Sequence, residues 1–369
     1  MKITSTLAAA PIMGMAAFLI TACDSGVMDA PMIDAPMEDV FAPVTASAGV
    51  GTITRFSAQA DDVIPQGAEI ERLTEDMFSW SEGPVWVSDE NGSGALYFTD
   101  VPQAKIYSYT DDAGLSVFVD KSGYTGEPNP VFGTEGANGL ILGPKTEAGE
   151  LTLIYGDHGT RRLMQLNLSD KSRAALSDNF EGRRFNSPND VVAHSSGALY
   201  FTDPPYGLKG LNDNPTKELP FSGVYRRAPD GTLSIIDRSL TFPNGVILSP
   251  DEQTLFVAVS DPKAAKLYRY DLNEAGLPAA RSDMFDFTSM TEEAPGLPDG
   301  MAISQTGYLF VTGPGGVHVF SPEGMRIALI STGTAAANCT FGGVNGDELY
   351  ITSGPFLARV KLSVTGLGL

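Results

Sequence analysis

The chain has 369 residues, of which 42% are hydrophobic and 19% are charged, and this composition indicates a packed body and excludes wholesale disorder. Asp and Glu number 45 against 24 Lys and Arg, so the formal net charge of −21 argues against nucleic acid as a partner. Two cysteines are too few for a disulfide framework, while 40 Gly and 25 Pro favour many short strands joined by turns over a helical bundle.

Residues 1–22 have the pattern of a secretory signal peptide. Lys2 precedes a run of apolar or small residues that ends in Ile20-Thr-Ala-Cys23, and no further charge occurs before Asp24. This ending resembles a bacterial lipoprotein signal, in which lipid is attached to the cysteine. We therefore expect a protein of the bacterial cell envelope, lipid-anchored through Cys23 on the periplasmic side, or a secreted one. The alternatives are an ordinary signal with another cleavage site and an uncleaved anchor.

The segment that follows, residues 23–62, is expected to be a flexible acidic tether. Pro31, Pro36 and Pro43 would interrupt a helix, and acidic side chains keep the segment hydrated. The folded domain is then expected to cover residues 63–369. A membrane contact is expected only through the lipid anchor.

One strand pattern recurs six times within that domain. Each copy is an apolar or aromatic run that ends in Thr-Asp or a similar pair, and the spacing between copies is roughly 40 to 57 residues. The copies begin at Leu96, Leu153, Leu199, Leu255, Leu309 and Leu349. Six units of three or four short strands predict an all-β fold, a six-bladed β-propeller, with a β-solenoid or a large sandwich as alternatives. We expect residues 69–73 to pair with the last strands near residues 359–362 and so to close the ring.

A second repeated element precedes each of these strands by roughly 10 to 15 residues. It is a polar residue, in most copies followed by glycine, at the expected start of the innermost strand of a blade: Glu82, Asn138, Asn189, Asn244, Asp299 and, in a degenerate copy, Asn338. Since innermost strands surround the central channel, the first five side chains should face one axis. Carboxylate and amide oxygens without His or Cys suit a hard cation such as Ca²⁺. The alternative is that each Asn-Gly or Asp-Gly is an ordinary turn.

Several short motifs in chain order carry a family resemblance. They are Ser81-Glu-Gly-Pro-Val-Trp86, Asn186-Ser-Pro-Asn-Asp-Val-Val192, Phe201-Thr-Asp-Pro-Pro-Tyr-Gly207, Phe242-Pro-Asn-Gly-Val246 and Pro298-Asp-Gly-Met301. Over about residues 70 to 362 the chain resembles the SMP-30/gluconolactonase family. The resemblance implies a six-bladed propeller with a divalent metal in the central channel, and it places the metal ligands on Glu82, Asn189, Asn244 and Asp299. The expected ion is Ca²⁺, with Zn²⁺, Mg²⁺ and Mn²⁺ as alternatives.

The same resemblance implies hydrolysis of a sugar lactone or related ester by metal-activated water. We choose Asp299 as the carboxylate that activates the water. Asn138 and His158 are candidates to orient substrate hydroxyls, and His158 is also a candidate base, the alternative being a hydrogen-bonded histidine at a strand end. At the position of a substrate-binding Arg in mammalian members, this chain has Ser187.

Three aromatic residues lie in or near these motifs. Tyr206 follows two prolines at a strand end, where a rigid loop would form a wall of the pocket or simply pack. We expect Trp80 and Trp86 to pack within the first blade instead of contacting a ligand.

Two rival functions stay open at this point. One is a phosphotriesterase that uses the same site, and the other is a non-enzymatic envelope propeller that binds a partner. The chain contains no G-x-S-x-G, H-E-x-x-H or P-loop motif, so serine-hydrolase, zincin and nucleotide-binding chemistry have no support.

Overall fold

The structure is a computed structural model that describes residues 49–88, 93–127 and 129–367. The expected signal peptide (1–22), the expected lipid attachment at Cys23 and the first part of the expected tether lie outside the described residues. Those expectations therefore stay predictions.

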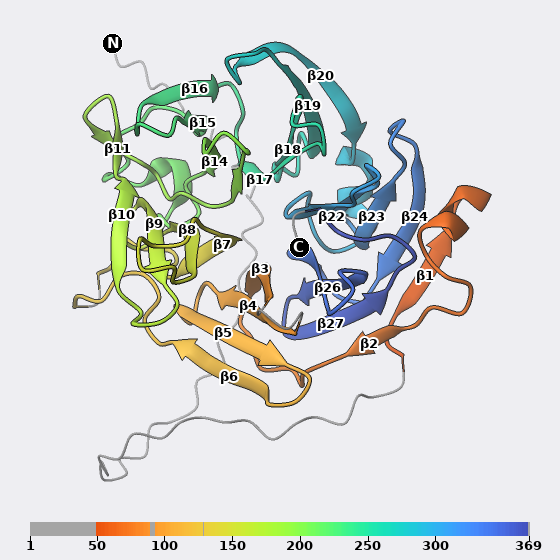
Figure 1. The fold of residues 1–369 in the computed structure, drawn as a ribbon. Helices are drawn as coiled ribbons and strands as arrows, with labels where there is room; N and C mark the ends of the chain where they lie inside the picture. The colour runs from red at the N-terminus through yellow and green to blue at the C-terminus, as the bar shows by residue number, and fades with distance from the viewer. Residues whose placement is uncertain (1–48, 89–92, 128, 368–369) are drawn as a thin grey trace, which may run out of the picture. The chain divides into compact units, whose positions relative to one another are not determined.

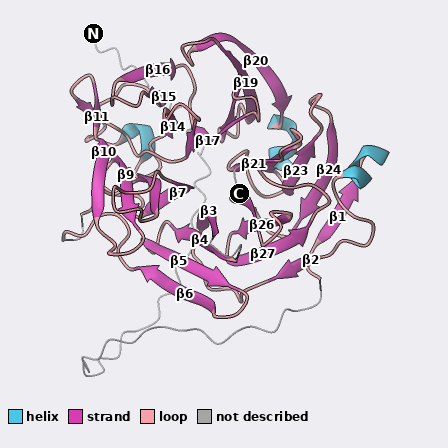
Figure 2. Cartoon of the chain, viewed as in Figure 1, coloured by secondary structure: helices cyan, strands magenta, loops and turns pink. Residues whose placement is uncertain are grey.

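Six antiparallel sheets form the blades of a propeller, which confirms the predicted fold (Figures 1 and 2). Within each blade the consecutive strands run from the innermost outward, and two strands from the beginning of the domain are added outside blades 5 and 6. Blades 1 to 3 are β3 (Ser81–Ser88), β4 (Gly94–Asp100), β5 (Lys105–Thr110) and β6 (Gly114–Val119); β7 (Ala137–Leu142), β8 (Thr152–Asp157), β9 (Arg162–Asn167) and β10 (Arg173–Ser177); and β13 (Val191–Ala193), β14 (Leu199–Asp203), β15 (Gly223–Arg227) and β16 (Leu233–Asp237).

The second half of the ring continues the same order. Blades 4 to 6 contain β17 (Pro243–Leu248), β18 (Thr254–Val259), β19 (Lys266–Leu272) and β20 (Pro278–Asp286); β21 (Met301–Ile303), β22 (Leu309–Gly313), β23 (Gly316–Phe320) and β24 (Arg326–Ser331); and β25 (Asn338–Gly342), β26 (Glu348–Ser353) and β27 (Phe356–Lys361). The loops carry a small hairpin and three short 3₁₀ helices: β11 (Asn179–Phe180), β12 (Arg183–Arg184), η1 (Ala58–Asp62), η2 (Leu211–Asp213) and η3 (Thr288–Glu292).

A strand from the beginning of the domain closes the ring. β2 (Ile70–Arg72) is the outermost strand of blade 6, where Ile70 lies opposite Val360 and Glu71 opposite Arg359 of β27. The predicted pairing of residues 69–73 with the last strands is thus confirmed. This hydrogen-bonded ladder joins the two ends of the domain. The edge of β27 that faces β2 is therefore paired.

The expected tether is wrong at its C-terminal end. β1 (Thr52–Arg55) adds a fifth strand to blade 5 by pairing with β24, and η1 follows directly. Val63 and Ile64, just after η1, are fully buried in the same hydrophobic cluster as β24. Because prolines and acids precede it, this short strand of β-branched residues was not predicted from the sequence. Its stability comes from pairing and packing and not from its own composition.

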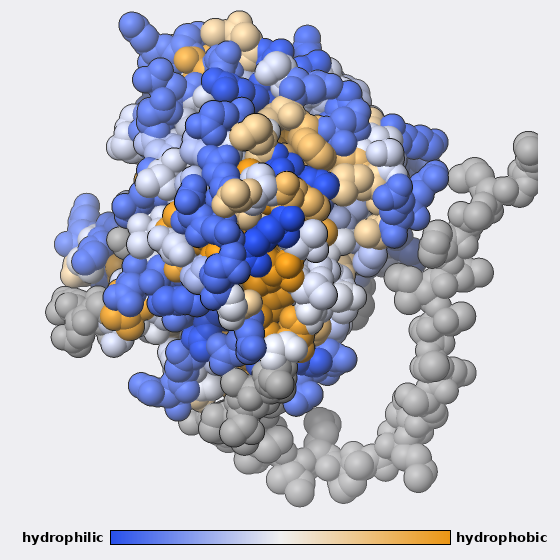
Figure 3. Space-filling view, turned by 90° about the vertical axis from the view of Figure 1, so that its right-hand side faces the viewer, coloured by the Kyte–Doolittle hydropathy of each residue, from blue (hydrophilic) through white to orange (hydrophobic). Residues whose placement is uncertain are grey.

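The hydrophobic core lies between neighbouring blades. One cluster joins Leu96 and Phe98 of blade 1 to Tyr350 and Leu357 of blade 6, and the Trp86 ring stacks on Tyr350 with centroids 5.5 Å apart. Trp86 therefore packs in the core, as expected. Viewed from the side that carries β1 and β24, hydrophilic residues cover most of the surface around a central hydrophobic patch (Figure 3). None of the described helices is long and apolar enough to span a membrane.

Candidate active site

The polar residues that begin the inner strands converge on one cavity. Its volume is about 600 Å³, and its lining includes all five side chains expected to share an axis, together with the two other candidates: Glu82, Asn138, His158, Asn189, Tyr206, Asn244 and Asp299. These residues come from five blades, and the first and last of them, Glu82 and Asp299, lie 217 positions apart in the sequence. The structure thus brings together every predicted site residue that it describes, although their individual roles stay predictions.

A repeated bulge places these side chains. The ladder register shifts between Glu82 and Val85 in blade 1, and the same shift occurs in blades 2 and 4, at Ala137/Leu140 and Pro243/Val246. A β-bulge re-aims one side chain without breaking the strand. The polar residue at each bulge therefore turns toward the cavity while the rest of the strand stays in its sheet.

The glycine after the polar residue has a packing role and does not form a turn. A Cβ on Gly83 would overlap the carbonyl oxygen of Asn138 in the next blade, and a Cβ on Gly245 would overlap the carbonyl oxygen of Asp299. Gly83 also has a φ of +47°, which few side chains tolerate. The Asn-Gly pattern thus marks the close approach of adjacent inner strands, and the interpretation as ordinary turns is wrong.

The recurring Thr-Asp pair explains how the blades hold this geometry. The hydroxyl of Thr99 donates to the carbonyl oxygen of Asn138 at 3.1 Å, and that of Thr202 donates to the carbonyl oxygen of Asn244 at 2.6 Å. Each threonine therefore links its own blade to the inner strand of the next one. Buried hydrogen bonds of this kind fix distances between blades as well as stabilising them.

The aspartate of the same pair fixes the segment before the cavity residue. Asp203 accepts from the backbone N–H groups of Asn186 and Ser187, both at 2.8 Å, just ahead of Asn189. In blade 1, Asp100 accepts from the N–H of Ser79 at 2.8 Å and from that of Trp80 at 3.3 Å, just ahead of Glu82. The sequence repeat is thus a positioning device for the residues at the channel.

The two acids at the cavity are unfavourably placed without a positive partner. Burial, reinforced by the nearby charge of Asp190, raises the pKa of Glu82 to about 7. Burial and the neighbouring Glu82 raise the pKa of Asp299 well above its usual range. Like charges that share a desolvated site repel one another, and a cation between them would remove that cost.

The amides beside the acids complete the case for a cation. Asn244 donates from its amide nitrogen to the Ser260 hydroxyl at 2.8 Å, while its buried amide oxygen has no hydrogen-bond partner. Within the described residues no cluster of three His, Cys, Asp or Glu side chains is arranged around a common point, so the donors here are two carboxylates and neutral amide oxygens. This all-oxygen set fits a hard divalent ion such as Ca²⁺ better than a site built on His or Cys.

Comparison with known proteins now places the chain. The sequence pattern of the SMP-30/Gluconolactonase/LRE-like region matches residues 80–355. The chain belongs to this family. The resemblance carried by the short motifs is thereby confirmed.

Named relatives and solved structures agree with this placement. A gluconolactonase from Zymomonas mobilis is 40% identical over 323 residues, covering 86% of this chain and 88% of that protein. Pentonolactonase XacC from Haloferax volcanii is 24% identical over 290 residues, covering 77% and 84% of the two chains. A solved gluconolactonase from Xanthomonas campestris is 28% identical with a TM-score of 0.71, covering 88% of this chain and 99% of that one.

His158 lies at the cavity of this SMP-30/gluconolactonase-family propeller as a neutral side chain. Its Nδ1 is 2.7 Å from the Thr134 hydroxyl and its Nε2 is 3.4 Å from the amide nitrogen of Asn138. Because the Asn138 amide nitrogen can only donate, Nε2 accepts and the proton resides on Nδ1. Burial lowers the pKa of His158 to about 3. Thr134 was not predicted, since it lies in a loop without a repeated motif.

Two further residues test expectations taken from the family. Tyr206 lines the cavity and its ring stacks on Phe242 with centroids 5.7 Å apart, so it both forms a wall and packs. Ser187, in contrast, is completely buried, donates to the carbonyl oxygen of Pro204 at 2.5 Å and accepts from the Gly207 N–H at 2.9 Å. Ser187 therefore does not replace the arginine of mammalian family members as a substrate contact.

Trp80 differs from its expected role. Its side chain lines the cavity with 37% of the residue exposed, and the indole Nε1–H donates to Oε1 of Glu82 at 3.2 Å. The expectation that Trp80 packs within blade 1 is wrong. Its position two residues before Glu82 was the available signal.

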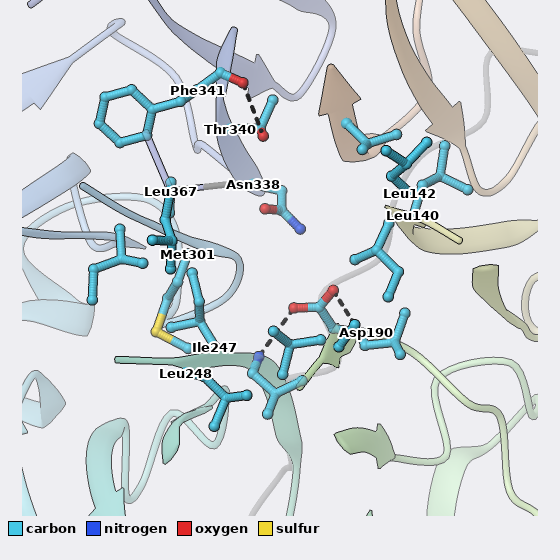
Figure 4. Close-up of a pocket in the computed structure, with 18 of the residues that line it drawn as sticks. Leu140, Leu142, Asp190, Ile247, Leu248, Met301, Asn338, Thr340, Phe341 and Leu367 are labelled. Atoms are coloured by element: carbon cyan, nitrogen blue, oxygen red, sulfur yellow. Dashed lines mark hydrogen bonds between the residues drawn. The ribbon is translucent and has the colours of Figure 1, made fainter. Parts of the chain in front are cut away.

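A second hollow of about 440 Å³ involves later residues of the same inner strands (Figure 4). Its lining is mainly apolar, including Leu140, Leu248 and Met301. Asp190 and Asn338 bring polar atoms to it, and the Asp190 carboxylate accepts from the backbone N–H groups of Val191 and Val246, each at 3.0 Å. Burial raises the pKa of Asp190 to about 6, and these two backbone hydrogen bonds act in the opposite direction.

Proposed function

We propose that this protein hydrolyses the ester bond of a sugar lactone and that a divalent cation in the first cavity supports the reaction. Its relationship to gluconolactonases makes it a hydrolase of carboxylic ester bonds, as the sequence predicted. The proposal of a sugar lactone substrate and a divalent cation rests on the composition of the cavity. Two carboxylates and an amide oxygen without a hydrogen-bond partner lie there beside neutral hydrogen-bonding groups.

The residues of the cavity have distinct roles in this reaction. Glu82, Asn189, Asn244 and Asp299 would hold the cation, which when bound supplies Lewis-acid polarisation of the lactone carbonyl. Asp299 accepts a proton from the water whose oxygen bonds to the carbonyl carbon. It returns that proton to the ring oxygen as the C–O bond of the ester breaks, so lactone and water give one hydroxy acid.

His158 and Asn138 orient the substrate in this proposal. A histidine with a pKa near 3 is a poor base at neutral pH, because base catalysis works best when the pKa lies near the working pH. Asp299 is therefore the better candidate for proton transfer. The hydrogen bond from Asn138 to His158 leaves the Asn138 amide oxygen to accept from a substrate hydroxyl.

A lactone panel assayed by acid release tests the function. Gluconolactone, pentonolactones and a phosphotriester are compared on the chelator-treated protein and on the same protein with calcium restored. We expect turnover of lactones that depends on the added ion. Turnover of the phosphotriester alone would favour the rival enzyme, and no turnover of any ester would favour a non-enzymatic propeller.

We also propose that Ca²⁺ is the preferred ion, since the donor set contains only oxygen. Calorimetric titrations of the chelator-treated protein with Ca²⁺, Mg²⁺, Mn²⁺ and Zn²⁺ rank the ions. A bound ion should raise the melting temperature because it binds the folded state. Tightest binding of Zn²⁺ would contradict the proposal.

The location stays a separate proposal: a lipid-anchored protein of the bacterial envelope, attached through Cys23. Cys23→Ser should yield an unprocessed or soluble protein on fractionation. Cys339→Ser is the matched control, because Cys339 is buried in the core and should not affect membrane attachment. A Cys23→Ser protein that keeps its mature size and its membrane attachment would contradict the anchor.

A further inference from the structure

We propose that Trp80 has two functions at the candidate active site: its indole N–H orients the Glu82 carboxylate for the cation, and its exposed ring forms a wall against which the substrate ring binds. The first function rests on the geometry around Glu82 and on the proposed cation site. The second rests on the proposed lactone hydrolysis.

The orientation of Glu82 follows from its hydrogen bonds. Trp80 donates to Oε1 at 3.2 Å, whereas the Gly83 N–H and the Asn338 amide donate to Oε2 at 3.2 and 3.4 Å. The two carboxylate oxygens are thus held from different sides, by neighbouring residues and by blade 6. A ligand fixed in this way loses less freedom on binding an ion, so the outer partners raise metal affinity.

Trp80 is itself held rigidly. Its backbone N–H donates to Oδ1 of Asp100 at 3.3 Å, and its carbonyl oxygen accepts from the Val101 N–H at 3.3 Å. Ser81, the next residue, donates its hydroxyl to the carbonyl oxygen of Gly354 at 2.9 Å. The indole therefore extends from a backbone fixed to blades 1 and 6, and does not belong to a free loop.

The ring also has an exposed surface where a substrate would lie. Trp80 is among the few large hydrophobic residues that are more than a third exposed, and it lines the cavity together with Val101 and Pro102. Polar groups lie in the same cavity, among them the amide of Asn138, which is hydrogen-bonded to His158. A cyclic sugar has apolar C–H faces and polar edges, and a rigid aromatic surface beside a few polar groups matches that combination.

Two substitutions separate the two functions. Trp80→Phe keeps an aromatic wall but removes the N–H donor, so calcium affinity should fall roughly 10- to 100-fold while KM at saturating calcium changes less than about threefold. Trp80→Gln keeps an N–H donor of similar reach but removes the ring. It should retain calcium affinity within about threefold and raise KM for gluconolactone about tenfold.

Calcium affinity is measured by calorimetry on the chelator-treated full chain, and KM by acid release from gluconolactone. Trp86→Phe is the matched control, since Trp86 packs on Tyr350 in the core and should leave both quantities unchanged. Trp86→Phe also leaves Trp80 as the only tryptophan of the chain, so its fluorescence reports ligand at the cavity directly.

The outcomes separate this proposal from the proposed function. A crossed pattern, with affinity lost in one variant and KM raised in the other, supports both functions of Trp80. Equal losses of both quantities in the two variants, or no change in either, would overturn it. If no lactone is turned over, the proposed function fails on its own, while calorimetry still decides the donor function and Trp80 fluorescence with added gluconate decides the wall.

Discussion

The two hollows along the inner strands differ in chemistry. At the first cavity five of the strands begin with Glu, Asn or Asp, and the two acids there have no positively charged partner among the described residues. At the second hollow the inner strands contribute mainly apolar side chains, and one of its carboxylates, Asp190, accepts from backbone N–H groups. The polar side chains around the first cavity thus come from the strand starts, while later residues such as Leu140 pack between blades.

The largest expected effect comes from replacing each of the two acids of the first cavity by its amide. Asp299→Asn keeps an oxygen donor but removes the proposed base, so kcat should fall about 10²- to 10⁴-fold even at saturating calcium. Glu82→Gln removes only a ligand charge, and excess calcium should restore much of its rate. Both variants are assayed across a calcium titration with metal occupancy measured alongside.

Two results would contradict the roles given to these two acids. If Asp299→Asn recovers fully at saturating calcium, Asp299 is only a ligand and the base lies elsewhere. If Glu82→Gln stays inactive with the ion bound, Glu82 has a role in the reaction itself.

The blades and the first cavity could be predicted from the sequence. The strand repeat specified six blades, and the polar residues at a constant offset specified the first cavity, because both patterns recur with the period of the fold. Trp80, Thr134 and β1 were not recovered as site or blade elements. Each occurs once, so no repetition marked it, and each depends on contacts with residues distant in sequence, such as β24 for β1.

The second hollow should respond in stability and not in binding. Leu140→Ala removes a buried side chain that packs between blades 1 and 2 and should lower the free energy of unfolding by about 2–5 kcal/mol. Calcium affinity should stay within about threefold of the wild-type value. Denaturant unfolding and calorimetry measure the two quantities, and a large loss of affinity would mean that the two hollows are not separable.

The two buried histidines, His158 at the cavity and His318 within blade 5, should make the stability of the protein depend on pH. The folded pKa of His158 is about 3 and that of His318 about 4, both lowered by burial from an unfolded value near 6.5. Below pH 6.5 the unfolded chain gains protons that the folded chain does not, so stability is lost as the pH falls toward the folded values. Each histidine contributes up to about 1.4 kcal/mol per pH unit in this window.

Replacing either histidine by glutamine should therefore make the free energy of unfolding fall less steeply between about pH 6 and pH 4.5. The slope should decrease by the contribution of one proton. Only His158→Gln should also raise KM for a lactone, because His318 donates from its Nε2–H to the Pro314 carbonyl oxygen within blade 5 and does not line the cavity. Thermal unfolding across pH together with kinetics checks this. Unchanged slopes in both variants would show that the histidines are protonated in the folded protein.

The smallest expected effect concerns the threonines that link neighbouring blades. Thr202 donates to the carbonyl oxygen of Asn244, an expected metal ligand, whereas Thr99 donates to that of Asn138, which is not in the expected ligand set. Val replaces Thr with nearly the same shape, so each Thr→Val change should cost about 1 kcal/mol of unfolding free energy. Only Thr202→Val should also weaken calcium binding, because it releases the strand that carries Asn244. If Thr99→Val weakens calcium binding as much, then Asn138 belongs to the ligand set, or the inner strands move together and the site depends on the whole ring.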